Sequence, residues 1–164
     1  MKKISKTQQK NNCISLSQVL ENGVYSVEAV FENTDNNWNG VGIVQDSYNI
    51  PDDSRPDQSP GQAHMAVYGV QIFSGNTWCK GNRTDGNAKF QNNQIIKMEY
   101  DSEKGTLIFF LDNIQQPVYI TGIKEKVRFM IYLYNSGSSC TIRSLKKLAA
   151  PTSVYMPNEK AVLW

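Results

Sequence analysis

The sequence lacks the features that would place the protein in a membrane. No stretch of its 164 residues approaches the roughly 18 consecutive apolar residues that a membrane-spanning helix needs. The charged first twelve residues are followed by no apolar run of the kind found at the centre of a signal peptide. From these absences we expect a soluble, cytoplasmic protein without a membrane partner.

Cysteine and histidine are scarce. Cys13, Cys79 and Cys140 form neither an even set nor a C-x-x-C pair, which argues against a disulfide framework and against a zinc site. The single histidine, His64, has no nucleophile motif beside it, so no Ser or Cys triad is indicated. We expect reduced thiols, with Cys140 in the core, and neither a cofactor nor a metal.

An excess of one charge is also lacking. The chain has 17 Lys and Arg against 15 Asp and Glu, a net charge of +2, and its basic residues are scattered. The pair Lys146 and Lys147 is interpreted as solvated surface after the last strand. Without a basic stripe, we expect no nucleic-acid partner.

What the sequence has instead is a series of short segments with β-type alternation. In residues 127–134, VRFMIYLY, every second side chain from Val127 to Leu133 is apolar and would share one face of a strand. Similar segments occupy 24–31, 41–44, 65–70, 95–100, 107–111 and 140–143. No segment longer than ten residues keeps a helical period. The pattern predicts an all-β fold, a sandwich of two antiparallel sheets.

The predicted organisation is one domain with two tails. We expect a polar N-terminal tail at 1–14, a sandwich at 15–148, and a C-terminal tail at 149–164 that contains Pro151 and Pro157. The length suits one domain, and we expect a monomer. On this view residues 1–12 are dispensable.

One long segment interrupts the strands. Residues 45–62, QDSYNIPDDSRPDQSPGQ, hold three prolines and four aspartates with almost nothing apolar. Proline cannot donate to a strand ladder, so we predict a loop, and loops of this length are often functional. The aspartates lack the interleaved spacing of a calcium loop and are interpreted as solvated. A second long polar connection is predicted at 74–94.

Three carboxylates at 99–103 raise the question of catalysis. Glu99, Asp101 and Glu103 follow a spacing of two, and the segment resembles the E-x-D-x-E strand of β-sandwich glucanases, in which two carboxylates cleave the glycosidic bond. However, residues 102–105, SEKG, have turn chemistry, which would remove Glu103 from the strand and let Asp101 accept hydrogen bonds from turn amides. We interpret these carboxylates as capping or solvated groups and expect no enzyme.

Four segments, taken in order, resemble the SPRY domain family. They are GVYSVEAVF (23–31), WNGVGIV (38–44), MEYDSEKGTLIFFLDN (98–113) and VYITGIKEKVRFMIYL (118–133). The third is the most specific, being similar to the family's L-D-x-x-x-G-T-L-S-F-x-x-N-G hairpin. The resemblance covers roughly residues 15–148.

The resemblance implies a concanavalin-A-like sandwich that acts as a non-catalytic protein-interaction module. Such domains grip a segment of a partner protein with loops at one end, which correspond here to Asp46 to Pro60 and Tyr134 to Gly137. A carbohydrate-binding, lectin-like sandwich is the alternative, and a β-glucanase using Glu99 and Glu103 is a more distant one. Aromatic residues on a concave sheet would favour sugar, and a pocket between end loops would favour peptide.

The candidate binding residues come from counting connections, which alternate between the two ends of a sandwich. With a short return strand through Phe73, the count places 45–64, 74–94, 112–117 and 135–139 at one end, and 102–105 and 121–126 at the other. The first end would gather residue types that are common in binding hot spots, namely Tyr48, Arg55, Trp78, Arg83, Tyr134 and Asn135. Trp78 and Tyr134 have the alternative role of closing the core, whereas Tyr48 and Arg55 are expected to be exposed.

Overall fold

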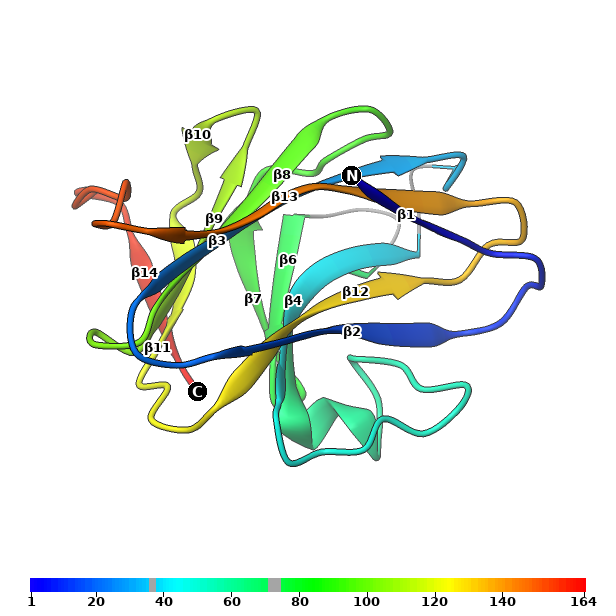
Figure 1. Ribbon diagram of the computed structural model, residues 1–164, viewed down its shortest axis with the longest axis horizontal. Coiled ribbons are helices and arrows are strands. Elements are labelled where there is room, and N and C mark those ends of the chain that lie inside the picture. The colour runs from blue at the N-terminus through cyan, green and yellow to red at the C-terminus, as the bar shows by residue number, and fades with distance from the viewer. Residues whose placement is uncertain (36–37, 71–74) are drawn as a thin grey trace.

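Strands make up nearly all the regular structure of the chain. The computed structural model describes residues 1–35, 38–70 and 75–164. Its strands form two sheets, and its short 3-10 helix η1 (Gly61–His64) ends the long loop. Within the described residues, no helix is long and apolar enough to cross a membrane. The predicted all-β sandwich is confirmed (Figure 1).

The larger sheet has the order β1-β13-β3-β8-β9-β11-β14, with β10 paired to β9. Its strands are β1 (Lys2–Ser5), β3 (Val24–Glu32), β8 (Ile95–Asp101), β9 (Thr106–Leu111), β10 (Ile114–Gln115), β11 (Val118–Thr121), β13 (Ser139–Leu148) and β14 (Lys160–Leu163). Neighbouring strands are antiparallel except for β11 and β14, which are parallel.

The smaller sheet has the order β2-β12-β4-β5-β6-β7 and is antiparallel throughout. Its strands are β2 (Asn12–Leu20), β4 (Asn39–Gln45), β5 (Met65–Gly69), β6 (Gly75–Cys79), β7 (Asn82–Asn87) and β12 (Val127–Leu133). In Figure 1 this sheet lies below the larger one, and the long loop hangs beneath it.

The main core fills the space between the sheets. The side chains that alternate along β12 from Val127 to Leu133 are fully buried in it, as the sequence predicts, and Cys140 joins them from β13. Tyr68 packs against Phe90 and Phe109, with ring centroids 5.1 and 5.2 Å apart. Burial of these apolar side chains is the main force that holds the two sheets together.

A second apolar cluster lies on the outer face of the smaller sheet. Its buried members are Val44, Met65, Val67, Val70, Met130 and Tyr132, and we call them the outer cluster. Half-buried side chains pack on it, among them Tyr48 and Ile50 from the long loop. Strand β12 is therefore buried on both faces, and its outer face depends on the loop for cover.

Both segments that were predicted as tails belong to the sandwich, so that prediction is corrected. Residues 1–14 contain β1, which pairs with β13, and the start of β2, while Ile4 packs against the main core. Residues 149–164 contain β14, and Val162 and Trp164 reach the core from there. Strand β1 was missed because its sequence is mostly polar, and β14 because it has only four residues; the pairing of both needs only backbone donors and acceptors.

The polar connection predicted at 74–94 is also corrected. It contains the hairpin of β6 and β7, with Trp78 opposite Arg83 and a turn at Lys80 and Gly81. Strand β7 ends the order of its sheet, and polar residues are usual on such edge strands. The proposed return strand through Phe73 lies outside the described residues.

Removing residues 1–9 should destabilise the fold. The truncation deletes the pairing of β1 with β13 and the packing of Ile4, so we expect the free energy of unfolding to fall by about 1–3 kcal/mol. Urea unfolding measures the change. Lys3→Ala is the control, because it breaks only an exposed ion pair with Glu32 and should leave the unfolding midpoint nearly unchanged. An unchanged midpoint for the truncation would restore the tail interpretation.

Candidate functional site

The strand register assigns most connections to the ends that the sequence predicts. At one end, the amide of Ile123 donates to the carbonyl of Gly105 at 3.0 Å, so the turns 102–105 and 121–126 meet. At the other, the amide of Asp112 donates to the carbonyl of Ile95 at 2.8 Å, and β13 begins beside Glu32. The connections 112–117 and 135–139 therefore share an end, as expected.

The long loop departs from this count. Gln45 lies opposite Val127, and the amide of Asp46 donates to the carbonyl of Lys126 at 2.9 Å, so the loop starts beside the 121–126 turn. It then crosses the outer face of the smaller sheet, where Ser54 accepts a hydrogen bond from the Cys13 thiol through its carbonyl. Placing 45–64 at the end of 112–117 and 135–139 was wrong. The loop both starts and finishes beside the 121–126 turn, since Met65 pairs with Val44, and only its middle crosses the sheet.

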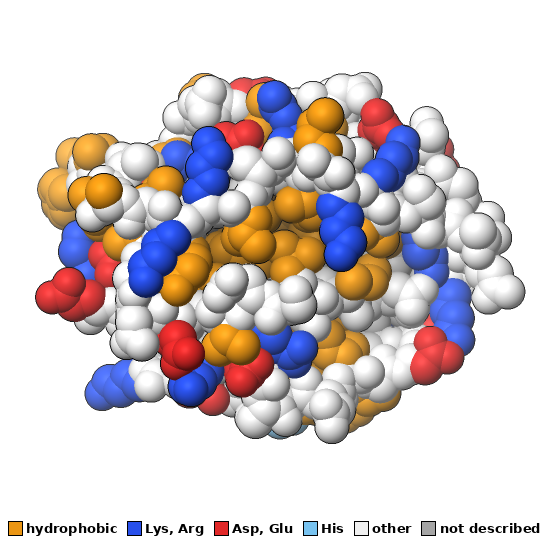
Figure 2. Space-filling model, viewed as in Figure 1, with side chains coloured by type: hydrophobic (Ala, Val, Ile, Leu, Met, Phe, Trp, Pro, Cys, Tyr) orange, Lys and Arg blue, Asp and Glu red, His pale blue; other side chains and the backbone are white. Residues whose placement is uncertain are grey.

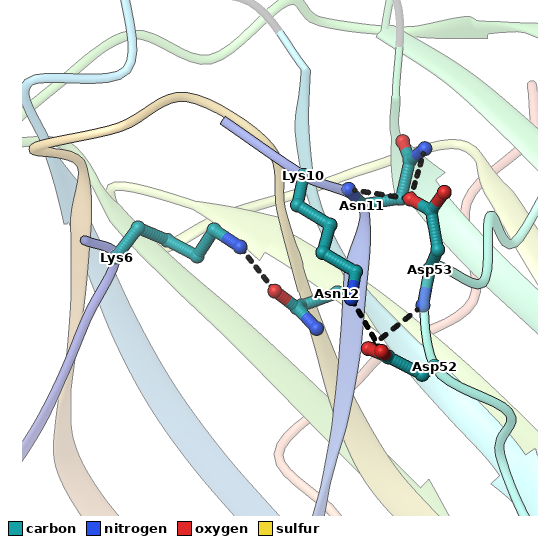
Figure 3. Close-up of polar contacts among 6 residues, drawn as sticks. All are labelled: Lys6, Lys10, Asn11, Asn12, Asp52 and Asp53. Atoms are coloured by element: carbon teal, nitrogen blue, oxygen red, sulfur yellow. Dashed lines mark hydrogen bonds and ion pairs between the residues drawn. The ribbon is translucent and has the colours of Figure 1, made fainter. Parts of the chain in front are cut away.

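Polar contacts fix the tip of the loop to the segment between β1 and β2 (Figure 3). Lys10 pairs with Asp52, and the ammonium of Lys10 lowers the pKa of the Asp52 carboxyl. Asp53 accepts hydrogen bonds from the backbone and the side-chain amide of Asn11, at 3.1 and 3.0 Å. The loop is thus attached to a segment that was itself predicted to be a free tail.

The other two loop aspartates pair with arginines. Asp46 lies 3.2 Å from Arg128, and Asp57 accepts two hydrogen bonds from Arg55, at 3.0 and 2.7 Å. The expectation of a solvated loop is therefore corrected, since each aspartate has its own partner. No group of His, Cys, Asp or Glu in the described part of the chain is placed to hold a metal ion.

The two loops singled out by the family resemblance meet at Trp38. The Arg55 guanidinium lies 4.9 Å from the centre of the Trp38 ring, and the Tyr134 ring lies 5.9 Å from it. The Asn135 side chain donates to the carbonyl of Thr34 at 2.9 Å, which fixes the second loop. We call Trp38, Arg55, Tyr134 and Asn135 the Trp38 junction.

Arg55 is held in place by a largely buried ion pair. Its side chain is 19% exposed and that of Asp57 only 2%. Burial disfavours the charged guanidinium, but the hydrogen bonds and charge of Asp57 outweigh it and raise the pKa of Arg55. The guanidinium is therefore a fixed, permanently charged group beside an aromatic ring.

The structure brings together only part of the predicted binding set. Arg55, Tyr134 and Asn135 converge at the junction, while Tyr48 and Trp78 pack on the outer cluster. Tyr48 stacks on His64 at 3.9 Å, and the Nδ1 atom of His64 lies 2.5 Å from Oε1 of Gln45.

Exposure differs from expectation at two of these positions. Tyr48 and Arg55 are half-buried rather than exposed, while Arg83 is exposed on β7 and paired with Asp85. Trp38 was not among the predicted site residues. The signal that could have found it is its place at the start of WNGVGIV, a strand motif of the family.

The carboxylates at 99–103 serve the structure. Glu99 is 2% exposed and accepts hydrogen bonds from the backbone amides of Thr152 and Ser153 at 3.0 and 3.1 Å. Asp101 accepts hydrogen bonds from the turn amides of Glu103 and Lys104 at 3.0 and 3.1 Å. The capping interpretation is confirmed for Asp101, and Glu99 caps the C-terminal segment in the same way.

The turn can be tested at Asp101. Asp101→Ala should destabilise the protein by about 0.5–2 kcal/mol, because two turn amides lose their acceptor. Glu103→Ala, on the exposed side of the same turn, should leave stability within about 0.5 kcal/mol of the parent. Thermal melting of both variants compares them directly, and equal losses would contradict the capping role.

Glu99 should make stability depend on pH in the acid range. Burial raises its pKa, but the hydrogen bonds from Thr152 and Ser153 outweigh burial and lower it below the ordinary 4.5. A lowered folded pKa stabilises the protein above the unfolded value, and this contribution is lost as the pH falls through the folded pKa. Glu99→Gln should therefore cost about 1–3 kcal/mol at pH 7.

The difference between the parent and Glu99→Gln should shrink as the pH is lowered below 4.5, because the parent carboxylate then becomes protonated. Urea unfolding at a series of pH values measures it. A difference that stays constant between pH 7 and pH 3 would show that the charge of Glu99 does not stabilise the fold.

Comparison with known proteins identifies the fold. The SPRY domain of human HERC1 superposes with a TM-score of 0.65 at 19% identity, covering 81% of this chain and 82% of that one. The TRIM65 PSpry domain gives 0.62 at 14%, covering 80% and 68%. Stonustoxin gives 0.60 at 15%, and the 79% of this chain that matches spans 20% of the toxin chain. No protein-family model and no curated protein matches the sequence. The chain has a SPRY-like fold.

Proposed function

We propose that the chain is a non-catalytic protein-interaction module that binds a segment of a partner protein at the Trp38 junction. The observation that carries the proposal is the meeting of the long loop and the 134–137 loop around one tryptophan ring. Trp, Tyr and Arg are the residue types enriched in binding hot spots, because they combine a large contact area with polar tips. The SPRY-like fold supports the same kind of function.

The junction is pre-organised for binding. Asp57 fixes Arg55, and Thr34 fixes Asn135 through its carbonyl, so little side-chain freedom is left to lose when a partner docks. Because Asp57 already neutralises Arg55, we expect the partner to present apolar and amide groups rather than acidic ones. The exposed Ser136 and Gly137 border the junction and leave room for an approaching chain.

The titratable groups support a role without catalysis. Glu99 is buried and occupied by backbone amides, while Glu103 is exposed in the turn that Asp101 caps, so the two glutamates are not arranged as a glycosidase pair. Burial raises the pKa of the Cys79 thiol to about 11 and that of Cys140 to about 12, so neither is a ready nucleophile. Three free cysteines also support a reducing compartment, and we propose the cytoplasm.

Carbohydrate binding has less support. A sugar-binding face usually offers aromatic rings to solvent. Among the residues that the structure describes, the large hydrophobic side chains that are exposed include one aromatic ring, that of Tyr155. It lies in the irregular segment before β14, not on a concave sheet. A glycan array therefore provides the counter-test, and specific glycan binding by the purified protein would favour the lectin alternative.

The proposal is tested with peptides selected from a displayed library of random sequences. For a peptide that binds at the junction, Tyr134→Ala combined with Asn135→Ala should weaken binding at least about fivefold, or roughly 1 kcal/mol. Tyr119→Ala, on β11 of the other sheet, is the matched control and should leave affinity unchanged. A thermal melt of each variant separates lost contacts from lost folding. If every selected peptide binds the double variant as tightly as the parent, the assignment of the site is wrong.

A further inference from the structure

An open groove separates the two sheets along one side of the sandwich. It has a volume of about 610 Å³ and lies between β1 and β13 of the larger sheet and β2 of the smaller one. Its apolar lining consists of Met1, Ile4, Ile14, Leu16, Ile142 and Leu145. Figure 2 shows hydrophobic side chains gathered in a trough across this face, with basic side chains at its margins.

The groove exists because β1 covers only part of β13. Strand β1 pairs with β13 only along Ser139 to Ile142, where Lys2 lies opposite Ile142. Strand β13 continues beyond this point to Leu148. Over residues 143–148, β13 pairs with β3 on one side, and no described strand pairs with its other side. Figure 1 shows the N-terminus beside β13 partway along that strand. An unpaired strand edge offers backbone donors and acceptors to another chain.

One apolar side chain on this edge, that of Leu145, points into the groove without full cover. After a bulge between Ile142 and Ser144, Leu145 lies opposite Val27, which is fully buried in the main core. Leu145 therefore faces the space between the sheets, yet it is 40% exposed. On the far wall, Leu16 of β2 packs only partly against the core. An apolar side chain entering here would cover both leucines.

The charges at the groove have one sign. The charged residues that line it are Lys2 and Arg143, and the exposed Lys146 follows on the same strand edge. No ion pair involves any of these three within the described chain. Acidic side chains on an incoming segment would therefore find unpaired cations.

We propose that an extended segment of a partner protein binds here by adding a strand to the free edge of β13, in line with β1. Its apolar side chains would enter the groove at alternate positions, and its acidic side chains would face Lys146 and Arg143. Residues 143–148 span about 20 Å as a strand, so about six residues of the partner would complete the edge. This surface is distinct from the Trp38 junction and does not depend on it.

The same displayed peptide library tests the proposal on the full chain. Selected peptides that alternate apolar and acidic residues should lose binding at least tenfold with Leu145→Asp and be unaffected by Val154→Asp, an equal change at an exposed site outside the groove. Arg143→Glu with Lys146→Glu should weaken the same peptides at least tenfold, while Lys124→Glu should not. Melting temperatures close to that of the parent show that each variant is folded.

Hydrogen exchange supplies a readout specific to strand addition. A bound peptide should slow amide exchange within 143–148 and leave 139–142, already paired with β1, unchanged. Protection elsewhere, or selected peptides indifferent to Leu145→Asp, would overturn the proposal. Sedimentation that reveals a dimer lost in Leu145→Asp would assign the groove to a second copy of the chain and overturn it as well. Loss of peptide binding in Tyr134→Ala with Asn135→Ala tests the junction alone. Each proposal can therefore be contradicted without affecting the other.

Discussion

The burial of β12 on both faces is the constraint on which the rest of the structure depends. Its inner side chains form the middle of the main core, and on its outer face Met130 and Tyr132 need cover of their own. The long loop supplies that cover. Arg128, also on the outer face, fixes the loop by donating to the carbonyls of Asp46 and Tyr48, both at 3.2 Å. A segment rich in proline and aspartate is thereby ordered against the sheet.

Covering β12 also explains the position of the candidate site. Once the loop has crossed the sheet, Tyr132 donates a hydrogen bond to the Asn11 side chain at 2.8 Å, and Asp53 binds the same asparagine. With the loop held by these contacts, Arg55 lies beside Trp38. Tyr134, the residue that follows β12, packs against the same ring. The junction is thus a consequence of how the outer face is closed, and the N-terminal segment takes part in closing it.

The sequence predicted strands with a clear alternation of buried apolar side chains and missed several short or mostly polar ones. The patterns at 127–134 and 107–111 are strong because each strand contributes to the core. Strands β1 and β7 carry mostly polar residues and lie at sheet edges, so their pairing rests on backbone hydrogen bonds that leave no mark in the side-chain pattern.

For the candidate site, residue types were better predicted than their surroundings. Tyr134 and Arg55 were chosen for their chemistry, and the structure does bring them to one place. Their burial could not be predicted, because it depends on where a loop of more than 15 residues lies after leaving the sheet. Contacts between residues far apart in the sequence, such as those of Asp53 with Asn11, decide the path of the loop.

The central claim is that the long loop closes over β12 and meets the 134–137 loop at Trp38. Nuclear Overhauser effects from the indole of Trp38 test it most directly, since they report protons within about 5 Å of each other. The account predicts cross-peaks from this ring to the side chains of both Arg55 and Tyr134 in the free protein. An indole with cross-peaks to neither side chain, together with unprotected amides throughout 46–60, would contradict it.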